Sequence, residues 1–301
     1  MAQLIKLQDY ISRYETDIYR YPTQFLRLKK ENYEAIHAKW LQEQENQLEP
    51  SIDEEPDSPG RWKRWFKKRH ESNEEIQGST LPETEEELKY QFLEKIYHFQ
   101  LKWASSTLQE VSFLDPHYEL DERLKYFLKR FPDTYLILYQ PIFRLKQALF
   151  EIETIMITPT SIICLNWLND DEDDTTTYEP IDQRKWLKRV NGEKSTIVNP
   201  NLALKRSEGA LRNILNYKEI NYPIKKLVLS MNGTINHHHT PYQTEYIDIK
   251  NYESWFNENR QTKTPLKHQQ LKVANALLQH TQITSISRPE WEEVDEELDP
   301  I

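Results

Sequence analysis

The stretch EIETIMITPTSIICLNWL, residues 151–168, determines the fold class. Two runs of β-branched and large apolar residues lie on either side of Thr158-Pro159. Such runs are typical of buried β-strands, and a short segment that contains proline is typical of the turn between them. The sequence therefore predicts two neighbouring strands joined by a tight turn.

Further strands and helices are predicted on both sides of this stretch. Apolar runs predict strands at TYLILYQ (134–140), KKLVLSM (225–231) and TEYIDI (244–249). Asn191-Gly192 predicts a hairpin turn between WLKRV (186–190) and STIV (195–198). Apolar residues at helical spacing predict helices after Asp115-Pro116 and over 202–215. This mixture predicts a mixed α/β fold, with a central β-sheet flanked by helices and a helical extension at the N-terminus.

The composition excludes several classes of protein. The chain has 301 residues, a net charge of −10, only 5 Gly and a single cysteine, Cys164. Few glycines argue against Gly-rich phosphate-binding loops, and one cysteine excludes a disulfide framework within the chain. The N-terminus lacks the apolar run of a signal peptide, and no apolar stretch is long enough to cross a bilayer. We therefore expect a cytoplasmic protein.

The first 113 residues are predicted to form a helical extension. Residues 1–48 are interpreted as a helical hairpin interrupted at Pro22, and residues 49–81 as a polar linker. A long helix over 82–115 follows, with an N-cap predicted at Thr80. Its apolar residues recur every three or four positions, as in helices that pack against one another: Leu88, Phe92, Ile96, Phe99 and Trp103. We expect these helices to pack on themselves or on a second copy, as a homodimer.

Three features between residues 118 and about 230 resemble the nuclease-related domain (NERD) family, a branch of the restriction-endonuclease-like fold. They are Asp121-Glu122 within YELDERLKYFLKRF, the two strands around Thr158-Pro159, and Asn199-Pro200 before the helix LALKRSEGALRNIL. Their order and spacing match the family pattern. The resemblance implies a domain over 116–260 related to metal-dependent nucleases, followed by a C-terminal helix and acidic tail over 261–301.

The departures from this family pattern fall at the positions that would carry the chemistry. Glu122 and Glu153 match the helix and strand carboxylates and are the catalytic candidates. Cys164 stands where the family has its catalytic Glu, and Asn166 where it has Lys. Cysteine is a poor Mg²⁺ ligand and asparagine carries no charge. We therefore expect an inactive domain that acts as a binding or scaffold module, with Mg²⁺ or Mn²⁺ bound only if catalysis survives.

A basic aromatic segment, RWKRWFKKRH (61–70), is the most conspicuous local feature. On a helix, its aromatic residues would lie on one side with cations around them. This arrangement suits an anionic membrane surface, single-stranded nucleic acid, or docking on the protein itself. The candidate binding residues are Arg61, Trp62, Lys63, Arg64, Trp65, Phe66, Lys67, Lys68 and Arg69.

Three functions thus follow from the sequence. The first is a NERD-like scaffold that binds a protein or nucleic acid. The second is a divergent metal-dependent nuclease that acts on DNA through Glu122 and Glu153. The third is a peripheral membrane-surface protein that binds through residues 61–70.

Overall fold

The computed structural model describes residues 1–48, 82–145, 148–168, 176–237 and 239–288. The chain forms two compact units, one of residues Met1–Leu26 and Lys95–Ile301, the other of residues Arg27–Glu94. The candidate residues Glu122, Glu153, Cys164 and Asn166 all belong to the first unit. The basic aromatic segment 61–70 and Thr80 lie outside the described residues.

The first unit is built on a mixed six-stranded sheet in the order β1-β3-β6-β7-β11-β13. β3 is antiparallel to β6 and β6 to β7, whereas β1–β3, β7–β11 and β11–β13 are parallel pairs. The strands are β1 (Gln3–Leu7), β3 (Leu136–Tyr139), β6 (Thr154–Ile157), β7 (Ile162–Trp167), β11 (Ile224–Leu229) and β13 (Thr244–Ile247). The mixed α/β class and the flanked central sheet are confirmed.

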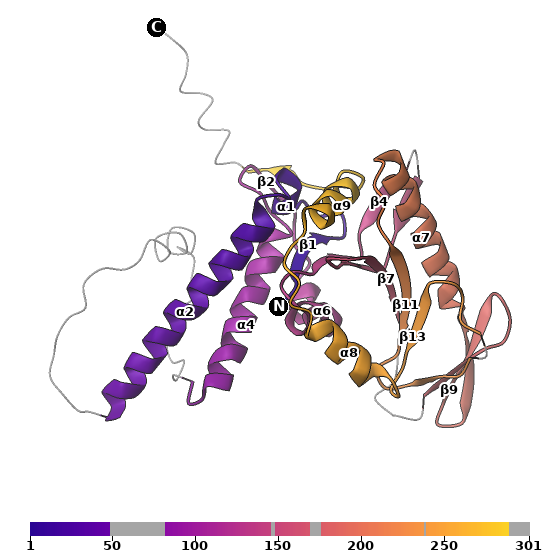
Figure 1. Cartoon of the computed structure of the whole chain (residues 1–301), viewed down its shortest axis with the longest axis horizontal. Helices are drawn as coiled ribbons and strands as arrows, with labels where there is room; N and C mark the ends of the chain where they lie inside the picture. The colour runs from indigo at the N-terminus through magenta and orange to yellow at the C-terminus, as the bar shows by residue number, and fades with distance from the viewer. Residues whose placement is uncertain (49–81, 146–147, 169–175, 238, 289–301) are drawn as a thin grey trace, which may run out of the picture. The chain divides into compact units, whose positions relative to one another are not determined.

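Helices cover both faces of this sheet (Figure 1). α7 (Pro200–Tyr217) contacts β7 and β11 on one face, where α9 (His268–Leu278) contacts β6 and α7. On the other face, α6 (Glu122–Arg130) contacts β3 and shares a hydrophobic core with Trp255 of α8 (Tyr252–Arg260). Cys164 and Asn166 alternate with Ile163 and Leu165 along β7, and the latter two belong to that core. Cys164 and Asn166 therefore face α7.

A second sheet of four strands, in the order β10-β9-β8-β12, carries the predicted hairpin. β9 (Lys185–Val190) and β10 (Glu193–Val198) pair antiparallel on either side of Asn191-Gly192. Both turn residues have positive φ, 50° and 89°, as a type I′ turn requires. The hairpin prediction is confirmed. The other two strands are β8 (Thr177–Pro180) and β12 (Thr234–Ile235).

The prediction of a helix at the start of the chain is wrong. Residues Gln3–Leu7 form β1, an edge strand parallel to β3, and every residue of it is buried. Burial on both faces removes the alternation of polar and apolar residues that marks a half-exposed strand, and here even Gln3 and Lys6 are buried. Helix formation begins only with α1 (Arg13–Thr16), which Ser12 caps through a capping box with Glu15.

Two long helices follow the first strand, but residues 21–48 form one helix instead of a hairpin interrupted at Pro22, and the helix predicted over 82–115 ends at Trp103. They are α2 (Tyr21–Leu48) and α4 (Glu85–Trp103), and Pro22 lies in the first turn of α2, a position that proline favours. Within the second unit, the Trp40 indole donates a hydrogen bond to the Pro82 carbonyl (2.7 Å), and Tyr33 packs on Phe92. These helices thus pair within one chain.

Short elements complete the fold. They are β2 (Glu110–Val111), α5 (His117–Leu120), β4 (Ile142–Leu145), β5 (Ala148–Glu151) and β14 (Ile286–Ser287). Among the described helices, none combines the length and the apolar character that a membrane span requires.

The burial of β1 gives a stability prediction. Leu4 is fully buried, so Leu4→Ala leaves a cavity in the core. We expect its free energy of unfolding to fall by roughly 3 kcal/mol. Leu120→Ala, at a side chain that is 75% exposed, should change it by less than about 0.5 kcal/mol. Urea unfolding followed by circular dichroism measures both, and equal effects would argue against a core position for β1.

Candidate active site

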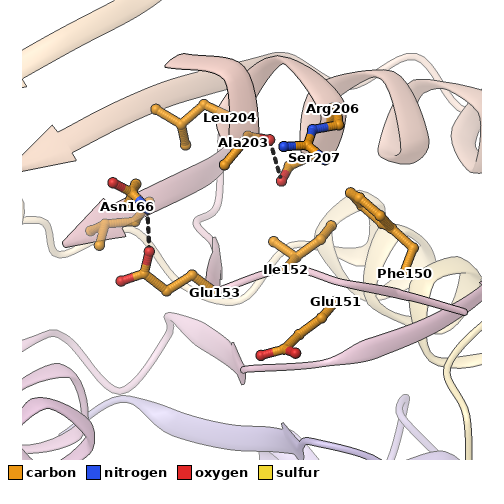
Figure 2. A pocket seen from close by; sticks show the side chains of 10 residues that line it. Phe150, Glu151, Ile152, Glu153, Asn166, Ala203, Leu204, Arg206 and Ser207 are labelled. Carbon is orange, nitrogen blue, oxygen red and sulfur yellow. Dashed lines mark hydrogen bonds between the residues drawn. The ribbon is translucent and has the colours of Figure 1, made fainter. Parts of the chain in front are cut away.

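The antiparallel pairing of β6 with β7 brings Glu153 and Asn166 together. Thr154 lies opposite Leu165 and Ile155 opposite Cys164, so Glu153, directly before β6, comes opposite Asn166. The Asn166 side-chain amide donates a hydrogen bond to Glu153 Oε2, as Figure 2 shows. The Trp167 backbone N–H donates to Glu153 Oε1 over 2.9 Å. Both carboxylate oxygens therefore have a donor.

Burial raises the pKa of Glu153 above its ordinary value, because the half-buried carboxylate has lost part of its hydration. The Trp167 backbone N–H, the positive charge of Arg123 and the Asn166 amide act in the opposite direction. The Arg123 guanidinium lies over the Trp167 ring, 5.7 Å from its centre. A carboxyl group in this state accepts and releases protons closer to neutral pH than an exposed one.

A pocket of about 140 Å³ opens beside Glu153, between the β6–β7 pair and the first turns of α7. Glu151, Glu153 and Asn166 line it from the sheet side (Figure 2). On the α7 side, Ser207 donates a hydrogen bond to the Ala203 carbonyl (3.0 Å), and Arg206 is exposed. The pocket therefore brings two carboxylates, those of Glu151 and Glu153, and one guanidinium, that of Arg206, to one opening.

The structure does not place Glu122 in this pocket. Its side chain is 82% exposed and pairs with Lys125 over 3.0 Å. The preceding residue, Asp121, turns inward instead, because it caps α6 through the backbone N–H groups of Arg123 and Leu124. The Tyr139 hydroxyl donates to its second oxygen over 2.9 Å. Of the two predicted carboxylates, only Glu153 lines the pocket.

Cys164 lies deeper, beneath α7, and does not line the pocket. Burial raises the pKa of its thiol to about 12, so the thiol stays protonated and unreactive at neutral pH. Its neighbour across the sheet is Lys226 of β11, which forms an ion pair with Glu208 of α7. Arg212 also pairs with Glu208, over 2.8 Å. This ion-pair cluster ties α7 to the sheet.

The donor set does not fit a divalent cation. Within the part of the chain that the structure describes, no three His, Cys, Asp or Glu side chains converge as metal ligands do. Both oxygens of Glu153 already accept hydrogen bonds, and the amide of Asn166 faces one of them as a donor. The residues that would complete a Mg²⁺ or Mn²⁺ site at this pocket are thus missing from its lining.

Sequence reasoning missed the cations around this site. Arg206 was one exposed residue among several on a predicted helix, and only the packing of α7 shows that it borders the pocket. Arg123 lies two residues after Asp121, the capping residue of α6, and this position does not indicate which group its charge will act on. The sequence does contain a signal for the cap. An Asp directly before a helical run, here Asp121, is typical of an N-cap, whose carboxylate turns toward the backbone.

No family profile and no solved structure matches this chain. A protein of Geobacillus stearothermophilus named RNA 2',3'-cyclic phosphodiesterase is 37% identical over 113 residues, which cover 33% of this chain and 36% of that protein. The chain thus spans about a third of the length of this curated relative.

This similarity corrects the function predicted from the sequence. An inactive NERD-like scaffold and a restriction-endonuclease-like nuclease acting on DNA are both wrong, because the named relative is a phosphodiesterase of RNA. The NERD resemblance itself stays a prediction, since no family profile tests it.

The raised pKa of Glu153 predicts a pH-dependent effect on stability. The folded protein holds this proton more tightly than the unfolded chain, whose glutamate titrates near 4.5. Ionisation of Glu153 therefore costs stability as the pH rises from 4.5 through the raised folded pKa. Glu153→Gln removes that cost, so its free energy of unfolding should rise relative to wild type between pH 4 and pH 7.5.

Urea unfolding at both pH values measures this difference. Glu122→Gln is the matched control, because Glu122 is an exposed glutamate outside the pocket. If the free energy of unfolding of Glu153→Gln relative to wild type falls or stays constant with rising pH, burial does not raise the pKa of Glu153.

Proposed function

We propose that this protein is an RNA phosphodiesterase that hydrolyses terminal 2',3'-cyclic phosphates, with Glu153 as the general base. The observation that carries the proposal is the half-buried Glu153 carboxyl with its raised pKa, in a pocket that Arg206 borders. The substrate class comes from the similarity to the protein named RNA 2',3'-cyclic phosphodiesterase.

The reaction needs few protein groups. Ionised Glu153 accepts a proton from a water molecule whose oxygen attacks phosphorus. One of the two ring P–O bonds then breaks, and the departing ribose oxygen takes a proton from solvent. The product is a phosphate monoester beside a free hydroxyl. Arg206 stabilises the negative charge that accumulates on the phosphoryl oxygens.

The hydrogen bonds to Glu153 have two consequences for this role. The Trp167 backbone N–H is part of β7 and holds one carboxylate oxygen in place. Asn166, at the position where a lysine was expected, donates a neutral hydrogen bond instead of a full positive charge. A lysine there would favour the ionised form strongly and lower the pKa. Asparagine leaves Glu153 a better proton acceptor, because basicity rises with pKa.

Mutation of the base should abolish turnover without unfolding the protein. We expect Glu153→Gln to lower kcat/KM on a nucleoside 2',3'-cyclic phosphate by at least about 100-fold, the usual contribution of a general base. Glu122→Gln, an equal change outside the pocket, should retain wild-type activity. Chromatographic quantification of the monoester product measures both rates, with and without EDTA.

Two results would contradict the proposal. One is turnover by Glu153→Gln that equals wild type. The other is the absence of turnover by the wild-type protein on cyclic phosphate ends in any buffer. The pH profile adds a further test: activity should rise with pH as Glu153 ionises, with an apparent pKa above 4.5.

A further inference from the structure

The segment from Asp182 to Arg212 is basic although the chain is acidic. It contains eight Lys or Arg against three Asp or Glu, a net charge of +5, whereas the whole chain carries −10. This segment includes the β9–β10 hairpin and most of α7, which contributes Arg206 to the pocket. One of these cations, Arg206, therefore borders the pocket, and the others lie on the hairpin and on the helix to which Arg206 belongs.

The hairpin presents several of these cations on one face. Side chains two apart along a strand share a face, as do directly paired residues on antiparallel strands. By the observed register, one face carries six residues: Lys185, Leu187, Arg189, Lys194, Thr196 and Val198. All except the half-buried Leu187 are exposed. We call these six residues the hairpin face.

The charges on the hairpin face repel one another. Arg189 lies directly opposite Lys194, and like charges at such a position destabilise a hairpin. Glu179 of β8 offsets part of this by pairing with Arg189 over 3.2 Å. Lys194 forms no ion pair within the described part of the chain. A polyanion bound across this face would relieve the repulsion.

The hairpin is anchored near the pocket through its opposite face, which carries the buried Trp186, while the hairpin face points away from that contact. The Tyr246 ring packs against Trp186 of β9, with ring centres 5.5 Å apart. The Tyr246 hydroxyl accepts a hydrogen bond from Asn201 in the first turn of α7 (2.8 Å). Arg206 follows five residues later, roughly 8 Å along the helix. In Figure 1, the hairpin labelled β9 extends past the end of β13.

We infer that the hairpin face binds the phosphate backbone of single-stranded RNA and leads its 3′ end to the Glu153 pocket. The inference rests on the proposed function. The pocket, of about 140 Å³, is small beside the roughly 300–1,000 Å³ of sites that enclose a whole small molecule, so most of a bound strand would lie outside it. None of the six residues is aromatic, so the hairpin face contacts phosphates and does not stack on bases. Binding is therefore largely independent of base sequence.

The test uses the full chain and a fluorescent 16-nucleotide RNA that ends in a 3′-hydroxyl, which the enzyme cannot hydrolyse. We expect the triple variant Lys185→Ala, Arg189→Ala, Lys194→Ala to bind at least 10-fold more weakly than wild type at low salt. The slope of log K against log salt should become shallower by about 2, from three lost phosphate contacts. The matched control removes three exposed lysines elsewhere in the same unit: Lys250, Lys263 and Lys272.

A second readout separates this inference from the proposed function. The triple variant should lose activity on a 16-nucleotide RNA with a 2',3'-cyclic phosphate end more than on a cyclic mononucleotide. If the triple variant equals wild type in both RNA binding and this activity ratio, the hairpin face does not bind RNA, even when hydrolysis occurs. If wild type hydrolyses neither substrate but the triple variant still loses RNA binding, the proposed function fails and the binding surface stands.

Discussion

The register between β6 and β7 is the constraint on which the candidate site depends. It sets Glu153 opposite Asn166 and places the Trp167 N–H at the other carboxylate oxygen. A slip by one residue would turn Glu153 toward the opposite face, since strand side chains alternate. The apolar residues on the core face oppose such a slip: Ile163 and Leu165 of β7 pack there with Met156 of β6. The hydrophobic core therefore fixes the position of a polar group that it does not contain.

The pKa of the Glu153 carboxyl is set by two opposing effects: burial raises it, and hydrogen bonds together with the charge of Arg123 lower it. Burial without donors would leave it protonated, whereas full charge pairing would make it a weak base. The Lys226–Glu208–Arg212 cluster, on the same side of the sheet, illustrates the second case. There, hydrogen bonds and positive charges from Lys226 and Arg212 outweigh burial and hold the pKa of Glu208 below its ordinary value. Two carboxylates between α7 and the sheet thus differ in proton affinity because their partners differ.

The sequence predicted the central strands, the Asn191-Gly192 hairpin and α7 because each has a local signal in alternation, turn residues or helical spacing. It failed at β1, whose continuous burial removes the alternation that would identify a strand. The family pattern selected Glu122 as the inward carboxylate. In the structure Asp121 turns inward instead, because it caps α6, and Glu122 stays exposed. Arg206 was inaccessible to sequence reasoning, because its position at the pocket depends on how α7 packs against distant strands.

The proposed function requires an acidic chain to bind a polyanion, and the uneven distribution of its charges is compatible with this. The net charge of the chain governs its long-range repulsion of a polyanion. Salt at 0.1 M ionic strength screens this repulsion over about 10 Å. The energy of direct contact depends instead on the charges nearest the ligand. A basic hairpin joined directly to the helix that borders the pocket supplies those nearby charges without making the whole chain basic. Tyr246 contacts both the buried face of the hairpin and the first turn of α7, so the hairpin and the helix that borders the pocket are joined by packing as well as by sequence. Affinity and chemistry can then reside in adjacent but separate groups of residues.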